Sequence, residues 1–318
     1  GDSRTFRFPL RHSGTYWYHS HTGLQEQSGV YGSIVVTPRG GEKVKSDQDH
    51  VLVLSDWTDE KPKEVMRTLM RGSEWYAVRK GNAQSILGAA KAGKLKDYFD
   101  REKVRMPPMD LSDVAYDAFL INGKAQSEIK ARPGDRIRLR LINAGASSYF
   151  YAHSATGPLT IVSADGMDVV PTKVNRLLIG MAETYDVIVT IPRTGAFEFR
   201  TTAQDNSGHA SLFLGAGEKV MADRLPSPNL YSMDEMLSGA LQDSEAPLDG
   251  LRNAARPTAP YAFLKSPRPT NFKGKTTRQI ELRLTGDMTR YLWSFNGKTL
   301  GEESTIPVNK GEVLEIEL

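Results

Sequence analysis

Short runs of β-branched and aromatic residues recur along most of the chain, and turn-forming residues separate them. Asn122-Gly123 and Pro133-Gly134 are examples of these turns. Short strands punctuated this regularly favour an antiparallel sandwich or barrel over a sheet of alternating strands and helices. We therefore expect a mainly β fold, with strands at 15–19, 32–36, 51–54, 119–121, 136–142, 159–164, 177–179, 187–191, 197–201, 210–214, 279–284, 291–295 and 313–318.

Two of these runs carry a prediction about burial. Residues 136–142 alternate, which places Ile137, Leu139 and Leu141 on one face and arginines on the other. That pattern predicts a half-buried strand. Residues 51–54 are apolar throughout, which predicts a strand buried on both faces.

Residues 59–105 read as a helical insert. Met66 and Met70 lie four residues apart, as on one face of a helix, and the helical pattern of the sequence continues over 75–92 and 95–104. The insert has 12 Lys and Arg against 7 Asp and Glu, a net charge of +5, whereas the whole chain has +3. A basic insert could dock nucleic acid or an anionic surface, but a solvated helical face is the favoured interpretation. The small net charge of the chain predicts no nucleic-acid partner.

The remaining sequence suggests a connector and a further strand region. Residues 221–275 are rich in proline and include one short helical piece near 231–237. Runs of residues typical of strands resume after them. The chain starts beside strand text at Thr5–Phe8 and stops within a strand run, so we expect a piece of a longer protein. No apolar run approaches the ~20 residues of a membrane-spanning helix. The first residues show no charged-then-apolar leader, so we expect no signal peptide within this chain.

The strongest chemical signal is His19-Ser20-His21 at the end of an aromatic strand. Because side chains in a strand alternate, both imidazoles point to the same face, with Cα atoms roughly 6.6–6.8 Å apart. This spacing suits one ligand to each of two neighbouring metal ions better than two ligands to one ion, and neutral imidazole binds copper, zinc, iron and nickel. The alternative is an ordinary pair, one histidine hydrogen-bonded and one exposed. The chain has no cysteine, which excludes thiolate ligands and disulfides within it.

The surroundings of this pair resemble a known family. GTYWYHSHTGLQEQ at 14–27, followed by GVYG at 29–32, closely resembles the second copper motif of the multicopper oxidases and is most similar to the copper-resistance protein A family. Further segments that resemble landmarks of the same family cover nearly the whole chain: 51–57, 120–124, 138–143, 164–166, 185–187 and 292–297.

The resemblance implies cupredoxin-like Greek-key β-sandwich domains with a helical insert. It implies a first cupredoxin domain ending in 1–46, a second at 47–220 with the insert at 59–105, a connector at 221–275 and the start of a third domain at 276–318. Such enzymes hold four coppers, one at a mononuclear site and three in a cluster built from eight histidines in four motifs. By match to the second motif, His19 and His21 would each bind one copper of the type 3 pair. The other three histidine motifs and the cysteine of the mononuclear site are absent from this sequence.

The function implied is oxidation of Cu(I), for copper tolerance in the periplasm, coupled to reduction of O₂ to water. The electron donor is then Cu(I) or a small molecule. Alternatives are a laccase-like phenol oxidase and a copper-free cupredoxin-fold periplasmic scaffold. With two of eight cluster ligands, this chain by itself is expected to bind copper weakly and not to turn over O₂.

The other histidines and the methionines carry weaker signals. We expect His12, His50, His153 and His209 to be ordinary surface or packed residues. The pairs Met66 with Met70 and Met106 with Met109 could offer sulfur to Cu(I), but core packing is favoured. A connector with only Met221, Met233 and Met236 makes copper storage there doubtful.

Overall fold

The computed structural model describes residues 3–103, 110–228, 230–231, 254, 256–269, 274–287, 291–303 and 305–318. Contacts within the chain divide it into two units, Gly1–Pro62 with Asp110–Pro267 and Lys63–Met109 with Arg268–Leu318. Outside the described residues lie Met106, Met109, Met233, Met236 and most of the helical piece expected at 231–237.

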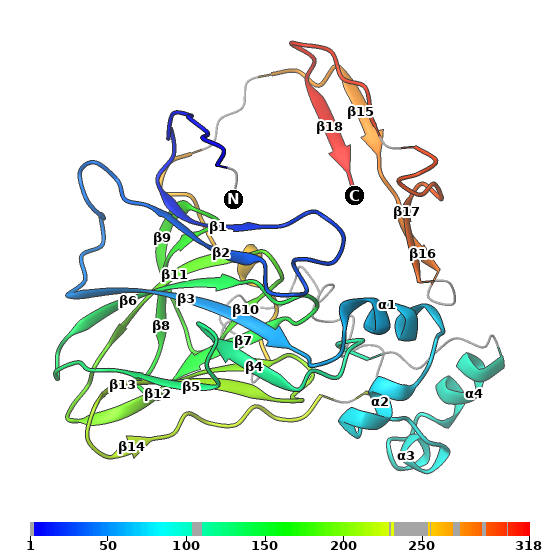
Figure 1. The fold of residues 1–318 in the computed structure, drawn as a ribbon, viewed down its shortest axis with the longest axis horizontal. Coiled ribbons are helices and arrows are strands. Elements are labelled where there is room, and N and C mark those ends of the chain that lie inside the picture. The colour runs from blue at the N-terminus through cyan, green and yellow to red at the C-terminus, as the bar shows by residue number, and fades with distance from the viewer. Residues whose placement is uncertain are drawn as a thin grey trace. The chain divides into compact units, whose positions relative to one another are not determined.

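The first unit contains two six-stranded sheets (Figure 1). One has the order β4 (Ala118–Ile121), β3 (Gln48–Trp57), β6 (Arg136–Asn143), β11 (Thr184–Thr190), β8 (Leu159–Ala164) and β9 (Met167–Val174). The other has the order β10 (Leu177–Ile179), β7 (Phe150–Ser154), β12 (Gly195–Ala203), β13 (His209–Ala216) and β5 (Gln126–Ile129), and β14 (Lys219–Val220) pairs with β12. Neighbouring strands are antiparallel except in the pairs β3–β6, β5–β13 and β12–β14.

The core of the first unit lies where the two sheets meet. Leu139 and Val187 come from the first sheet, Phe150, Phe199 and Leu214 come from the second, and all five are fully buried in one cluster. Burial of large apolar side chains provides the main driving force for folding, which explains why both sheets present an apolar face here. The predicted mainly β sandwich is confirmed. A 3₁₀ turn at Pro260–Ala262 precedes Phe263, which joins the same core.

Strand β6 is buried on both faces, so the prediction of a half-buried strand is wrong. Arg138 and Arg140 are only 2% and 3% exposed. Their charges are compensated by carboxylates from other segments, which allows the arginine face to be covered. The prediction for 51–54 is also wrong in part, because Leu52 and Leu54 are buried whereas Val51 and Val53 on the other face are partly exposed.

A separate two-stranded antiparallel sheet precedes the sandwich. It pairs β1 (Gly14–His19) with β2 (Tyr31–Val36), and places His19 opposite Tyr31. The strand text at Thr5–Phe8 forms no strand, contrary to expectation. The backbone N–H and C=O groups of a strand need a neighbouring strand as hydrogen-bond partner, and residues 5–8 pair with no described strand. The side chains of Phe6 and Phe8 are largely exposed.

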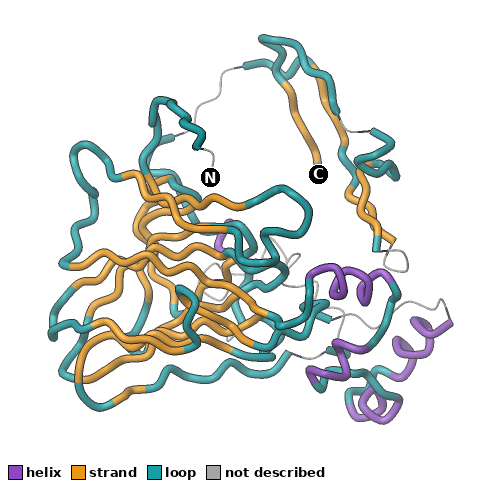
Figure 2. Tube along the Cα trace, in the orientation of Figure 1, coloured by secondary structure: helices purple, strands orange, loops and turns teal. Residues whose placement is uncertain are grey.

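The second unit contains the predicted helices (purple in Figure 2): α1 (Pro62–Met70, beginning at the unit boundary), α2 (Trp75–Lys80), α3 (Ile86–Lys91) and α4 (Leu95–Lys103). Ser85 caps α3 by accepting a hydrogen bond from the Gly88 amide at 3.1 Å. Helix α1 buries none of its residues, so core packing of Met66 and Met70 is not observed. None of the helices in the described part of the chain is long and apolar enough to cross a membrane.

The C-terminal part of the second unit forms two small sheets. The parallel pair is β15 (Arg278–Glu281) with β18 (Leu314–Glu317), and the antiparallel pair is β16 (Leu284–Asp287) with β17 (Leu292–Phe295). The single strand predicted at 279–284 is therefore two strands. The chain changes partner at the break, where the Leu282 amide donates to Glu317 and the Arg283 amide donates to the Asn296 side chain.

Candidate metal centre

The structure brings His19 and His21 together. His19 is the last residue of β1 and His21 follows two residues later, and their ring centroids lie 4.4 Å apart with planes tilted by 40°. The His19 side chain is 24% exposed, and His21 is an exposed residue. The two rings therefore lie on the same side of the chain, next to each other, and are accessible from solvent.

A compact loop between β1 and β2 supports this pair. The Ser20 amide donates to the Val30 carbonyl at 3.1 Å, and the Ser20 hydroxyl donates to the Gln25 side chain at 2.7 Å. These bonds close the loop on itself and place Glu26 beside His19, with Glu26 Oε2 2.8 Å from His19 Nδ1. On the strand, the Trp17 ring stacks on His19 at a centroid distance of 4.1 Å and an angle of 6°.

The contact with Glu26 defines which nitrogen of His19 is available. An ionised carboxylate only accepts hydrogen bonds, so this contact is a hydrogen bond when the His19 ring carries its proton on Nδ1. The lone pair of neutral His19 is then on Nε2, the form in which imidazole binds metals. His19 thus fits a copper ion as a single-nitrogen ligand. Glu26 lies within the sequence motif, but its role was not predicted, because only the folded loop places it beside the ring.

The two histidines by themselves would make only a partial set of metal ligands. Within the residues that the structure describes, no group of three or more His, Cys, Asp or Glu side chains is arranged to hold a metal ion. Two imidazoles fit copper chemically but leave its coordination incomplete.

The other histidines have separate surroundings. His50 Nε2 lies 2.9 Å from the Gln48 side chain, and His12 is exposed. His153 is buried and its Nε2 lies 2.7 Å from the Asp223 carbonyl. Burial lowers the pKa of His153 against the opposing effect of the Asp223 carbonyl. His209 is an exposed residue, and partial desolvation with Arg200 nearby lowers its pKa.

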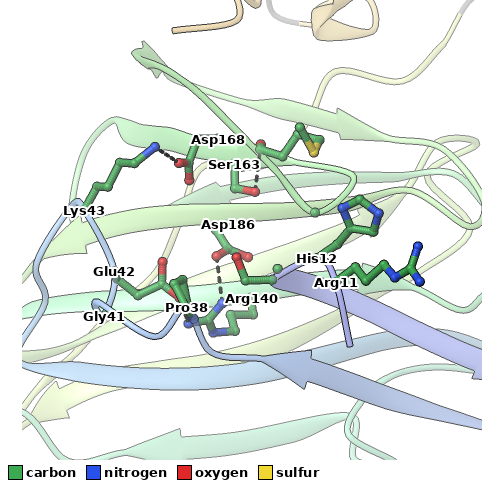
Figure 3. Close-up of a pocket in the computed structure, with 14 residues that line it drawn as sticks. Arg11, His12, Pro38, Gly41, Glu42, Lys43, Arg140, Ser163, Asp168 and Asp186 are labelled. Carbon is green, nitrogen blue, oxygen red and sulfur yellow. Dashed lines mark hydrogen bonds and ion pairs between the residues drawn. The ribbon is translucent and has the colours of Figure 1, made fainter. Parts of the chain in front are cut away.

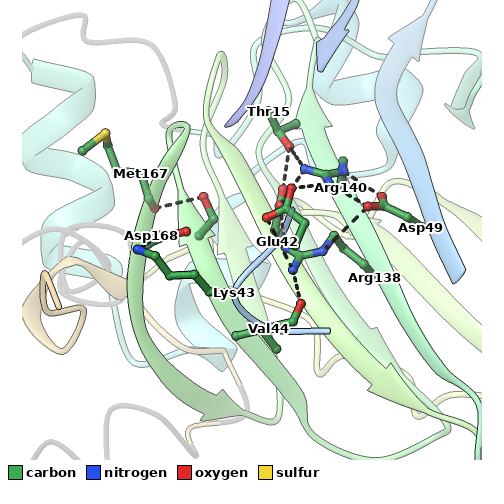
Figure 4. Close-up of polar contacts among 11 residues, drawn as sticks. Thr15, Glu42, Lys43, Val44, Asp49, Arg138, Arg140, Met167 and Asp168 are labelled. Carbon is green, nitrogen blue, oxygen red and sulfur yellow. Dashed lines mark hydrogen bonds and ion pairs between the residues drawn. The ribbon is translucent and has the colours of Figure 1, made fainter. Parts of the chain in front are cut away.

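Strand β1, which ends at His19, is fastened to the sandwich by a buried polar cluster (Figure 4). Thr15 in β1 donates to Asp186 Oδ1 at 2.6 Å, and the Thr184 hydroxyl donates to the Thr15 carbonyl at 3.0 Å. Arg138 and Arg140 of β6 both donate to Asp186 Oδ2, at 2.9 and 3.0 Å. Asp186 of β11 is therefore the shared acceptor of three side chains.

The same arginines also bind the segment that leads from β2 into β3. Arg140 contacts both carboxylate oxygens of Asp49 at 2.7 and 2.6 Å, and Glu42 at 2.8 Å. Arg138 donates to the Val44 carbonyl at 2.6 Å. Burial lowers the pKa of Arg140, but Asp49 and Glu42 outweigh this effect and the pKa is raised overall. Arg140 therefore remains charged.

A cavity of about 300 Å³ opens above this cluster (Figure 3). Its lining residues come from 11–14, 38–43 and 163–168, together with Arg140 and Asp186. Every nitrogen of the Arg140 guanidinium already donates to Asp49, Glu42, Thr15 or Asp186. Arg140 therefore offers no free guanidinium donor to a ligand in the cavity.

Comparisons with known proteins agree with the motif. Two multicopper oxidase family models match the chain, at residues 48–217 and at residues 1–41. Copper resistance protein A of Escherichia coli is 31% identical over 100% of this chain and 67% of its own length. Multicopper oxidase MmcO of Mycobacterium tuberculosis is 30% identical over 98% of this chain and 56% of its own length. The chain thus spans about two thirds or less of these relatives.

Solved structures show the same fold. Fet3p, a multicopper oxidase that functions in iron import, superposes with a TM-score of 0.58 at 17% identity, over 90% of this chain and 46% of Fet3p. The laccase from Botrytis aclada gives a TM-score of 0.52 at 20% identity, over 90% of this chain and 46% of the laccase. These likenesses confirm cupredoxin-like domains. The family models and the curated relatives together show that the chain belongs to the multicopper oxidases, a family of copper-dependent oxidoreductases.

Proposed function

We propose that this chain is part of an oxidase that removes one electron from each of four Cu(I) ions and passes the four electrons to O₂, which takes up four protons to give two water molecules. Similarity to copper resistance protein A over the entire chain supports Cu(I) as the donor. On the same ground we place the protein in the periplasm. Oxidation of Cu(I) to Cu(II) there would serve copper tolerance.

In this proposal, His19 and His21 each bind one copper of the type 3 pair. The supporting observation is the adjacency of the two rings, with His19 Nδ1 held by Glu26. Bound copper supplies the redox chemistry. The chain's own residues orient the ligands: Trp17 sets the plane of the His19 ring, Glu26 sets its tautomer, and Thr15 fixes β1 on the sandwich.

The proposed domain organisation follows the sequence motifs. We assign 1–46 to the end of a first cupredoxin domain, 47–220 to a second domain with the helical insert at 59–105, 221–275 to a connector and 276–318 to the start of a third domain. The two family models meet between residues 41 and 48, which supports the first boundary. The remaining cluster ligands would come from the parts of the relatives that this chain does not span.

The test uses the full-length protein and measures bound copper by elemental analysis and O₂ consumption with Cu(I) as donor. We expect His19→Ala with His21→Ala to lose copper and O₂ consumption, whereas His12→Ala, at another exposed histidine, retains both. Unchanged copper content in the double variant would refute the ligand assignment. A strong preference for a phenol over Cu(I) in the unmodified protein would favour the laccase-like alternative. A protein that binds no copper at all would favour the scaffold.

A further inference from the structure

Glu26 is positioned to decide how His19 presents itself to a metal. We infer that Glu26 is a positioning residue, which holds His19 in the Nδ1–H tautomer and one ring orientation so that Nε2 is the metal-binding atom. This inference rests on the proposed function for its purpose. Its physical content, however, concerns the metal-free chain and can be tested without copper.

The contact is specific and partly shielded. Glu26 Oε2 and His19 Nδ1 are 2.8 Å apart, within the range of a charge-assisted hydrogen bond, and the two side chains are only 23% and 24% exposed. Among the described residues, the Glu26 carboxylate makes no other hydrogen bond. Partial exclusion of water strengthens such a bond relative to one on an open surface.

The loop backbone delivers the carboxylate to that place. The Ser28 and Val30 amides both donate to the Gln25 carbonyl at 3.0 Å, and the Gly29 amide donates to the Glu26 carbonyl at 2.9 Å. Glu26 therefore lies in a succession of tight turns whose backbone groups are paired with each other. The carboxylate is held near His19 by the loop, instead of reaching it from a flexible segment.

The two neighbours of the His19 ring restrict different motions. Stacking on Trp17 fixes the plane of the ring, but a ring turned over by 180° would stack equally well. The turned ring would present a carbon to Glu26 and lose the hydrogen bond, so Glu26 selects one of the two orientations as well as the tautomer. His21 differs, because it is exposed and no described carboxylate contacts it. The pair is thus asymmetric: one ligand is set in advance and the other is not.

The experiment is long-range ¹H–¹⁵N correlation of the histidine rings in the copper-free 318-residue chain at one fixed pH above 7. We expect His19 to be a single Nδ1–H tautomer and His21 to be a mixture. Glu26→Ala should convert His19 to a mixture, Glu26→Asp should keep at least part of the Nδ1–H preference, and the neighbouring Gln27→Ala should change nothing. A wild-type mixture at His19, or a single Nδ1–H tautomer retained in Glu26→Ala, would overturn the inference.

A second measurement separates positioning from general support of the loop. Gln25→Ala removes the bond to Ser20 but leaves Glu26 in place, so it should disturb the loop without changing the His19 tautomer. If Gln25→Ala alters the tautomer as much as Glu26→Ala does, the role of Glu26 is merely structural and the inference fails.

Metal affinity gives the third readout, with Cu(I) added to the same chain. Glu26→Ala should weaken binding by about tenfold to a hundredfold, the usual effect of removing a hydrogen-bond partner of a ligand, and Gln27→Ala should not. Equal affinities of the two variants would contradict the inference. If instead the tautomer depends on Glu26 but His19→Ala and His21→Ala leave copper binding intact, the proposed function fails while the hydrogen-bond assignment stands.

Discussion

Replacement of Asp186 by asparagine is the sharpest test of how the β1 segment is held. Asp186 is 2% exposed and accepts hydrogen bonds from Thr15, Arg138 and Arg140. Asp186→Asn preserves the shape and size of the side chain but removes the negative charge between two buried guanidiniums. Its amide oxygen can still accept from one or two of these three donors, while its amide group adds a donor where none is needed.

The expected loss of stability is about 3 kcal/mol. Removing one partner of a buried ion pair costs roughly 3–5 kcal/mol, because the other charge remains buried. Here the cost should fall at the lower end of this range, because Arg140 keeps Asp49 and Glu42, and Arg138 keeps the Val44 carbonyl. Burial also raises the pKa of Asp186, against the opposing effects of Thr15 and the two arginines. The ionised form of Asp186 is therefore costly to bury, and its removal recovers part of that cost.

The assay is urea unfolding at neutral pH, which compares Asp186→Asn with Asp168→Asn. Asp168 pairs with Lys43, but both side chains are substantially exposed, at 43% and 68%. Exposed pairs contribute about 1 kcal/mol or less, so Asp168→Asn should be nearly neutral. If Asp186→Asn costs no more than Asp168→Asn, the cluster is not what holds β1, and the reasoning is refuted.

Two further perturbations test other parts of the first unit. Burial lowers the pKa of His153, so the native state binds fewer protons than the unfolded chain and stability should fall as the pH drops below about 6.5, by about 1.4 kcal/mol per unit of lowered pKa. The free energy of unfolding, measured in urea at pH 7 and pH 5, should differ less between the two pH values in His153→Gln than in the unmodified chain. The control His12→Gln, at an exposed histidine, should leave this difference unchanged. The same difference in both variants would argue against a role of buried His153. Gly14→Ala should lower the temperature of thermal unfolding more than Gly134→Ala does. Both glycines have a positive φ, at 143° and 89°. A Cβ at Gly14 would lie 2.4 Å from the Gly166 carbonyl oxygen, whereas Gly134 faces open space. Equal losses would mean that the backbone adjusts freely at Gly14.

The elements that were predictable from sequence are those whose pattern is local. The bounds of β6 and the existence of the helical insert follow from alternation and helical spacing, which a single segment displays. Among the described residues, four strands were missed: β5, β7, β9 and the two-residue β14. The polar sequence of β5 (QSEI) and the proline and lysine of the mostly exposed edge strand β9 lack the apolar run that marks a strand. Strand β7 (FYAHS) is buried but short, and carries little alternation.

The burial of Arg138 and Arg140 was not predictable for a different reason. An arginine face usually indicates solvent, and only the assembled fold shows that Glu42, Asp49 and Asp186, from three separate segments, converge on it. For the histidine pair, too, one feature was predictable from the sequence and another was not. The period of a strand predicts that His19 and His21 share a side, but the contact with Glu26 depends on how the intervening loop closes.

The attachment of β1 to the sandwich has a consequence for the order of assembly. A lone two-stranded hairpin is marginally stable in water, so the β1–β2 pair would not by itself keep its side chains ordered. Because Thr15 is bound to β11, and the segment after β2 is bound to β6, the entropy of ordering this hairpin is already spent when the sandwich folds. In the proposed function, a metal arriving later then meets one ligand, His19, that needs little further ordering, and more of its binding free energy appears as affinity. Maturation of the enzyme would thus run from polypeptide to metal, with the copper-free chain serving as the template for loading.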